Sequence, residues 1–249
     1  MNNVQKIIEI IVNEYSTQEG VEGVFWGGSS SNMELEEFSD IDIFIITNDE
    51  CLRKKGLKRI YNIEVEYFVN PISHVMQQME KEIGIFHDYW AIKIYAFSKI
   101  VYDKNGKSKM LQQKALSMFN MGFGMIDEST DLLNYYNAHD CYNKYRSMIK
   151  NELQWRIGYY ECIKALLLAH CYHNRLPLIP WNKAQRLLTD EKYRNAYHLK
   201  KMPEEKFCKL FLCCISSETE DKMFPAIDEL YHYCFFYSNY NFNDFEIEK

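Results

Sequence analysis

The sequence predicts an α/β (α+β) protein in which a small mixed β-sheet is followed by an α-helical bundle. Strand-like segments occur within about the first 105 of the 249 residues, and every clear pattern after them has helical spacing. Gly and Pro are scarce, at 10 and 5 residues, which disfavours an all-β fold with many tight turns. We therefore expect one domain at residues 1–107 and a helical C-terminal domain at residues 108–249.

The first domain is expected to begin with a helix, because apolar residues from Val4 to Tyr15 recur at three- and four-residue intervals. The segment 40–47 is the strongest strand, since its continuous apolar run is typical of a central buried strand. Residues 29–39 are polar and predict a loop with a helical turn, and helices are expected on one face of the sheet. The complete set of predicted strands is 21–28, 40–47, 62–71 and 99–103.

The remaining segments are predicted to be helical. Residues 72–97 form a helical segment with a weak break near Gly84, and Pro177 and Pro180 mark a loop in the second domain. The predicted helices of the second domain cover 108–121, 126–149, 151–173, 181–189, 203–216 and 219–239.

The amino-acid composition disfavours some classes of binding partner and cellular location. Lys and Arg total 29 and Asp and Glu total 35, so the net charge of −6 disfavours a protein that binds nucleic acid along a broad basic face. The eight cysteines form no Cys-x-x-Cys pair, and no apolar run is long enough to span a membrane. We expect a cytoplasmic protein with free thiols and no membrane contact.

The informative motif is Gly27-Gly28-Ser29, then ten intervening residues, then Asp40-Ile41-Asp42. Glycine lets the backbone approach a ligand closely, and exposed N–H groups with the Ser29 hydroxyl can bind phosphate oxygens. Asp40 and Asp42 are two residues apart on a predicted strand, so both carboxylates point to one face. Two such charges require a neutralising cation, and carboxylate oxygens suit Mg²⁺ or Mn²⁺. The motif predicts a site for a metal and a triphosphate.

A third carboxylate is available on a later predicted strand. Glu64 and Glu66 share one face of the segment 62–71, and one of them can complete the cluster if that strand lies beside 40–47. Three carboxylates could hold two metal ions.

The segment GGSSSNMELEEFSDIDIFI resembles the signature of the nucleotidyltransferase superfamily, which has the DNA polymerase β-like fold. Within that superfamily the chain is most similar to antibiotic nucleotidyltransferases of the aminoglycoside and lincosamide kind. The resemblance identifies residues 1–107 as the nucleotidyltransferase domain and assigns the third acid to Glu64 of IEVEYF, with Glu66 as second choice.

The resemblance implies an adenylyltransferase that moves a nucleoside monophosphate, AMP when the substrate is ATP, to a hydroxyl of a small molecule. Another nucleoside triphosphate could replace ATP and would supply its own monophosphate. Asp40, Asp42 and Glu64 would bind one or two Mg²⁺ ions, and Gly28 and Ser29 would grip the triphosphate. Glu64 would complete a second metal site or deprotonate the acceptor hydroxyl. An aminoglycoside or lincosamide acceptor implies a role in antibiotic resistance.

Two alternatives stay open. The same chemistry could modify a protein or a tRNA end, as nucleotidyltransferases of toxin–antitoxin pairs do, although a tRNA would favour a basic surface. A nucleotide-binding protein without turnover is the second alternative.

Further candidates lie in the helical half. Lys183 follows a Pro-Trp loop and is a candidate contact for the triphosphate, against a simple role at the start of the next helix. His170 and His173 share a helix face, but Cys171 points away, so packing is favoured over metal binding. The aromatic segment 231–242 is interpreted as a packing surface or the interface of a homodimer.

Overall fold

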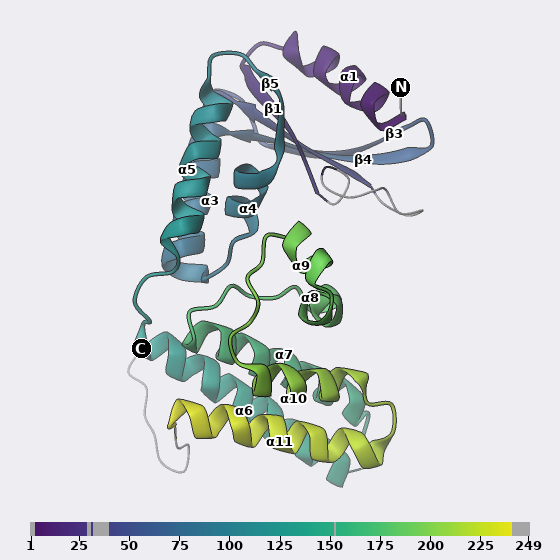
Figure 1. Cartoon of the computed structure of the whole chain (residues 1–249), viewed down its shortest axis with the longest axis vertical. Coiled ribbons are helices and arrows are strands. Elements are labelled where there is room, and N and C mark those ends of the chain that lie inside the picture. The colour runs from purple at the N-terminus through teal and green to yellow at the C-terminus, as the bar shows by residue number, and fades with distance from the viewer. Residues whose placement is uncertain (1–2, 29–30, 32–39, 152, 241–249) are drawn as a thin grey trace. The chain divides into compact units, whose positions relative to one another are not determined.

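The computed structural model describes residues 3–28, 31, 40–151 and 153–240, and the chain divides into two compact units (Figure 1). The first unit comprises Met1–Gly122 with Ala196–His198, and the second comprises Phe123–Asn195 with Leu199–Lys249. A mixed sheet with helices is followed by a helical region, as the sequence predicts.

The first unit is built on a five-stranded sheet with the strand order β3-β4-β2-β1-β5. Strands β2 and β4 are parallel and the other neighbouring pairs are antiparallel, so the sheet is mixed. Strand β2 lies at the centre, in agreement with its apolar sequence. The strands are β1 (Val21–Gly27), β2 (Ile41–Thr47), β3 (Lys54–Ile60), β4 (Ile63–Pro71) and β5 (Lys99–Asp103).

Strand β3 is the element of the sheet that the sequence pattern does not reveal. Its sequence, KKGLKRI, has four basic residues and a glycine, and its side chains are exposed or half-buried throughout. An edge strand needs no apolar run, since basic side chains there keep the free edge from pairing with other chains. A tight turn at Tyr61 and Asn62, both with positive φ (50° and 64°), connects β3 to β4.

Helices cover both faces of the sheet, whereas the sequence predicts them on one face only. Helix α1 (Asn3–Ser16) packs its apolar stripe on the face that carries Ile41, Ile43 and Ile45. On the other face, Phe44 contacts Tyr95 at 6.1 Å between ring centroids. The reason lies in β2, whose residues are buried on both sides and therefore need a covering layer on each. The second layer consists of α3 (Ile72–Lys81), α4 (Trp90–Phe97) and α5 (Lys107–Met121).

The predicted break in the segment 72–97 is real and lies just beyond Gly84. Helix α3 continues into a π-helical turn (Glu82–Phe86), and the chain reverses at His87 with φ 47°. The buried carboxylate of Glu82 then accepts hydrogen bonds from the backbone N–H groups of Ala91 (2.8 Å) and Ile92 (3.0 Å). Glu82 therefore satisfies the free donors at the beginning of α4.

The second unit is helical in its described residues, as predicted. Long helices α6 and α7 lie against each other, and their interior is rich in buried aromatic residues such as Tyr145 and Tyr159. No sequence pattern predicts the short helix α9 (Glu191–Ala196). The bounds are α6 (Glu128–Lys150), α7 (Trp155–His173), a 3₁₀ turn (Trp181–Lys183), α8 (Ala184–Thr189), α9 (Glu191–Ala196), α10 (Glu205–Ser216) and α11 (Glu220–Ser238). Among the helices of the described chain, none combines the length and apolar character needed to cross a membrane.

Helix α5 belongs to the first unit, although the sequence places the domain division before it, at residues 107 and 108. The buried residues of α5 include Leu111 and Ala115. The helix also packs closely on β1, because a Cβ added to Gly23 would lie 1.7 Å from the Ser108 hydroxyl oxygen. The position of the boundary between independently folding domains stays a prediction.

Candidate functional site

The beginning of β2 presents two carboxylates on one face of the sheet. Asp40 immediately precedes the strand and Asp42 is its second residue, so strand alternation directs both side chains to the same side. Asp40 is exposed and Asp42 is half-buried, which leaves carboxylate oxygens accessible from solvent. The pair is therefore positioned as the sequence predicts.

Glu66 of β4 completes the cluster. Because β4 runs parallel to β2 with Glu66 opposite Asp42, the two side chains are neighbours on the same face. One carboxylate oxygen from each of Asp40, Asp42 and Glu66 lies within 4.8 Å of the others. Three hard oxygen donors at this spacing fit a small divalent cation such as Mg²⁺ or Mn²⁺.

Glu64 lies outside this cluster, so the expected convergence of its side chain with Asp40 and Asp42 needs correction, while its role as the third acid stays a prediction. Its Oε2 atom is 3.0 Å from Nη2 of Arg59, which stands opposite it on β3. Glu64 is two residues closer to the β3–β4 turn than Glu66. Both residues share a face, so only the register between strands distinguishes them, and that register selects Glu66, the second choice.

Gly27 and Gly28 fit against the acidic cluster because they have no side chains. Gly27 pairs with Asp42 across β1 and β2, and a Cβ on it would lie 2.6 Å from the Ser98 hydroxyl. Gly28 has φ 67°, and a Cβ there would lie 1.9 Å from Oδ2 of Asp42. The backbone thus passes directly beside the carboxylate, an approach that a residue without a side chain allows.

The continuation of this turn is only partly described. Ser29 lies outside the described residues, so its predicted contact with phosphate stays a prediction. Ser31 is buried, and its hydroxyl donates a hydrogen bond of 2.9 Å to the Gly28 carbonyl.

Lys55 is a residue of the site that the sequence analysis missed. Its Nζ atom lies 2.7 Å from Oε1 of Glu66, and 4.9 Å from the centre of the Phe68 ring. Lys55 and Arg59 lie on the same face of β3. That shared face could have indicated Lys55 as a site residue, but only if residues 54–60 had first been identified as a strand. The positively charged ammonium group of Lys55 therefore lies beside the acidic cluster.

The candidates of the helical half are placed in the second unit. Lys183 ends the 3₁₀ turn before α8, and its predicted contact with the triphosphate stays a prediction. His170 is fully buried and stacks on Phe207 with 3.5 Å between ring centroids. Burial lowers the pKa of His170 to about 3, so it is neutral near pH 7. His173 instead contacts Asp131 at 2.7 Å. These contacts agree with the expected packing role of both histidines.

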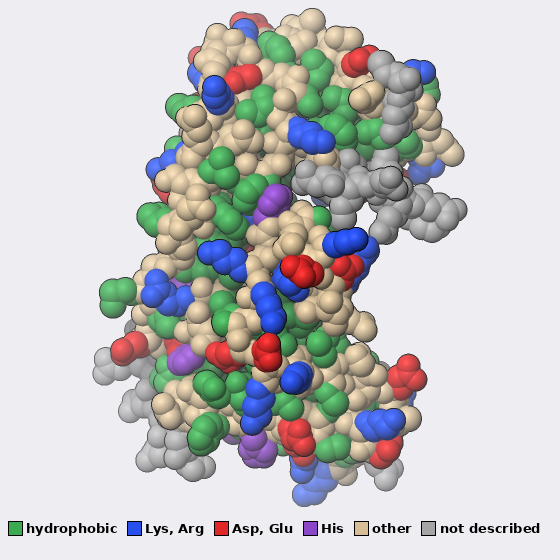
Figure 2. All heavy atoms as spheres, in the orientation of Figure 1, with side chains coloured by type: hydrophobic (Ala, Val, Ile, Leu, Met, Phe, Trp, Pro, Cys, Tyr) green, Lys and Arg blue, Asp and Glu red, His purple; other side chains and the backbone are tan. Residues whose placement is uncertain are grey.

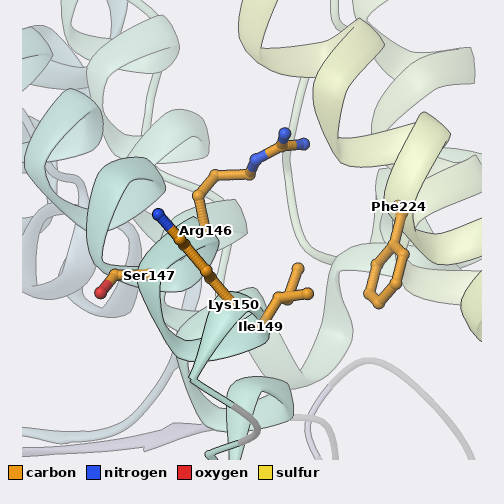
Figure 3. Close-up of a pocket in the computed structure, with 5 residues that line it drawn as sticks. All are labelled: Arg146, Ser147, Ile149, Lys150 and Phe224. Atoms are coloured by element: carbon orange, nitrogen blue, oxygen red, sulfur yellow. The ribbon is translucent and has the colours of Figure 1, made fainter.

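An open groove of about 680 Å³ lies on the second unit (Figure 3). Arg146 and Lys150 of α6 and Phe224 of α11 line it, together with Ser147 and Ile149. Arg146 is already paired with Asp228, at 3.1 Å. The acidic cluster does not line this groove, so the groove does not define the site.

Comparison with known family models supports a nucleotidyltransferase domain within the first unit. Residues 4–103 match the family model described as nucleotidyltransferase domain. This range contains β1, β2 and β4 with the glycine turn and all three clustered acids. No curated protein matches the chain.

Among solved structures, the chain is similar to a nucleotidyltransferase-like protein from Exiguobacterium sibiricum 255-15. The two share 13% sequence identity with a TM-score of 0.49, over 93% of this chain and 74% of the other.

Proposed function

We propose that the first unit catalyses metal-dependent transfer of a nucleoside monophosphate, AMP from ATP, to a hydroxyl of a small molecule. The domain match supports nucleotidyl transfer in general. The observation that carries the proposal is the convergence of Asp40, Asp42 and Glu66 beside the backbone of Gly28. The geometry combines donors for a divalent cation with a turn suited to phosphates.

Each residue has a role in this mechanism. Asp40, Asp42 and Glu66 would hold the divalent cation, which would supply neutralisation of phosphate charge and polarisation of the α-phosphorus. Gly28 lets the backbone approach the triphosphate, with Ser29 as a further contact. The acceptor oxygen then forms a bond to the α-phosphorus while the bond to the β-phosphate oxygen breaks and pyrophosphate leaves. The proton of the hydroxyl would pass to Glu66 or, where Glu66 is a ligand of the cation, to water.

An aminoglycoside or lincosamide antibiotic is the acceptor class that we favour. The sequence resemblance suggests it, and a net charge of −6 suits a cationic acceptor. On the face that Figure 2 shows, basic and acidic side chains of the described residues are interspersed. That view and the composition offer no support for a tRNA acceptor.

The test is incubation with α-labelled ATP and Mg²⁺ against a pooled library of hydroxyl-bearing antibiotics and metabolites. We expect label on a small molecule together with release of pyrophosphate. Both signals should be lost with Asp42→Asn, which removes one charge from the cluster while keeping the size of the side chain.

Other outcomes would redirect the assignment. Label on protein or tRNA would replace the small acceptor with a macromolecule. Binding of ATP with no pyrophosphate release from any acceptor would favour a catalytically silent protein. Near-native turnover by Asp42→Asn would refute the proposed site.

A further inference from the structure

The position of Lys55 affects how a divalent cation and a nucleotide would bind to the site, an inference that rests on the function proposed above. Lys55 lies on edge strand β3, and its ammonium group contacts Glu66 at 2.7 Å. Glu66 is also one of the three acids that converge within 4.8 Å. A lysine and a divalent cation would therefore share the same carboxylate.

We propose that Lys55 is an internal counter-ion, which holds Glu66 before a divalent cation binds and then, once displaced, binds the nucleotide phosphates. The Lys55 side chain is 64% exposed and that of Glu66 is 27% exposed. An ion pair this open is weak, so a divalent cation with three carboxylate ligands displaces the lysine at little cost. The flexible four-carbon stem allows the ammonium group to move while remaining near the site.

The surroundings favour phosphate as the second partner of Lys55. Its ammonium group lies over the Phe68 ring, with Nζ 4.9 Å from the ring centre. This contact holds the lysine on the face of the sheet that carries the acids. An ammonium group released there meets the negative charge of a bound triphosphate, with which it forms charge-assisted hydrogen bonds.

Arg59 provides a matched control on the same strand. It lies on the same face of β3, is 65% exposed and pairs with Glu64 at 3.0 Å, outside the acidic cluster. Lys55→Met and Arg59→Met each remove one positive charge from an exposed ion pair. A difference between these variants therefore reports the position of Lys55 rather than net charge.

The experiment measures two affinities of the full-length chain by isothermal titration. The first is for Mn²⁺ alone, and the second is for α,β-methylene-ATP with saturating Mg²⁺. We expect Lys55→Met to bind Mn²⁺ about two- to fivefold more tightly, because the competing cation is absent. The same variant should bind the nucleotide analogue about three- to tenfold more weakly. Arg59→Met should stay within about twofold of the unmodified chain in both measurements.

The outcomes separate this inference from the proposed function. The proposed function fails if the unmodified chain does not bind Mn²⁺, or if Asp42→Asn binds Mn²⁺ as well as the unmodified chain does. The role proposed for Lys55 then fails with it. If that binding is present but Lys55→Met matches Arg59→Met in either titration, the role of Lys55 alone is overturned. Opposite changes in the two affinities, confined to Lys55→Met, support it.

Discussion

A side chain at position 28 would occupy the space of the Asp42 carboxylate, so a substitution of Gly28 tests the site directly. In Gly28→Ala the new Cβ would stand 1.9 Å from Oδ2 of Asp42, at a residue with φ 67°. Asp42 must move, and a displacement of about 1 Å at a reacting centre costs about 100-fold in rate. We expect pyrophosphate release to fall by about that factor while the circular dichroism spectrum is retained.

Gly106→Ala is the control for backbone strain. Gly106 has a similar φ of 74°, but nothing lies within 4 Å of a Cβ placed on it. We expect it to lower the free energy of unfolding by about 1 kcal/mol and leave turnover unchanged. Equal losses of turnover in the two variants would show that strain, not contact with Asp42, explains the effect.

The identity of the third acid is tested by a pair of isosteric changes. Glu66→Gln removes a charge from the cluster, and we expect it to lower the rate of pyrophosphate release by about 100- to 1,000-fold. Glu64→Gln removes a charge that faces Arg59, so its rate should stay within about threefold. The reverse pattern, measured at saturating ATP and Mg²⁺, would restore Glu64 as the third acid.

The sequence predicted the pair Asp40 and Asp42 because alternation along one strand determines which side chains share a face. It could not distinguish Glu64 from Glu66, since both satisfy the same alternation. The distinction depends on Glu66 standing opposite Asp42 in the parallel pairing of β2 and β4. Register between strands that are distant in sequence is a tertiary property, and no local pattern contains it.

At the scale of elements, the beginning of α4 depends on one buried carboxylate. Glu82→Ala would leave the N–H groups of Ala91 and Ile92 without the acceptor that now lies at 2.8 and 3.0 Å. Each buried donor left unsatisfied costs about 1–3 kcal/mol, and we expect the free energy of unfolding to fall by at least about 2 kcal/mol. Urea denaturation measures it. Glu80→Ala, at an exposed position of α3, should cost less than about 0.5 kcal/mol.

The contact between α6 and α7 predicts a pH dependence. The hydrogen bond to Asp131 raises the pKa of His173 above its ordinary value of 6.5, despite partial burial. A raised folded-state pKa gives a stabilisation that is complete below the unfolded value and is lost as the pH rises through the folded value. His173→Gln should therefore reduce the free energy of unfolding more at pH 5.5 than at pH 8.5.

The difference between His173→Gln and the unmodified chain, taken at each pH, isolates this pair. Burial lowers the pKa of His170 to about 3, so His170 acts in the opposite direction, destabilising the fold as the pH falls below about 6.5. Burial is the larger cause of that low pKa and the charge of His173 the smaller one, so most of this contribution is common to both chains and cancels in the difference. A difference that does not change between pH 5.5 and pH 8.5 would contradict the role of the His173–Asp131 contact.

The sequence predicts those helices and strands that have one apolar face or two. Helix α5 and strand β2 were found within one residue of their bounds, because burial imposes a periodic pattern on their sequences. Strand β3 was missed because pairing with β4 determines it, while its side chains stay largely exposed. The short helix α9 buries only Tyr193 and has no pattern long enough to detect.

At the scale of the whole molecule, the change from mixed to helical sequence indicated two parts but not the position of the division. The sequence places it at residues 107 and 108, where strands end. Contacts in the structure place α5 with the sheet and begin the second unit at Phe123. A helix that covers a sheet and a helix of a bundle can have the same amphipathic pattern, so the sequence of α5 does not show which partner it packs on.

Truncation decides between the two boundaries. A fragment of residues 1–107 lacks α5 and exposes the surface that Leu111, Ala115 and Met118 now cover, all of which are buried. Loss of one buried Leu or Met side chain costs about 2–5 kcal/mol, and a whole domain is stable by only about 5–15 kcal/mol. We therefore expect residues 1–107 to aggregate or to lack a cooperative unfolding transition.

A fragment of residues 1–122 keeps α5 and should fold. It loses the stacking of Phe97 on His198, at 3.7 Å between ring centroids, which costs about 1 kcal/mol and is small beside the loss of a helix. We expect a cooperative thermal transition that Mn²⁺ shifts upward, since the acids at positions 40, 42 and 66 are all present. Cooperative unfolding and Mn²⁺ binding by residues 1–107 would instead establish the earlier boundary, and would mean that α5 covers the sheet without being required for it to fold.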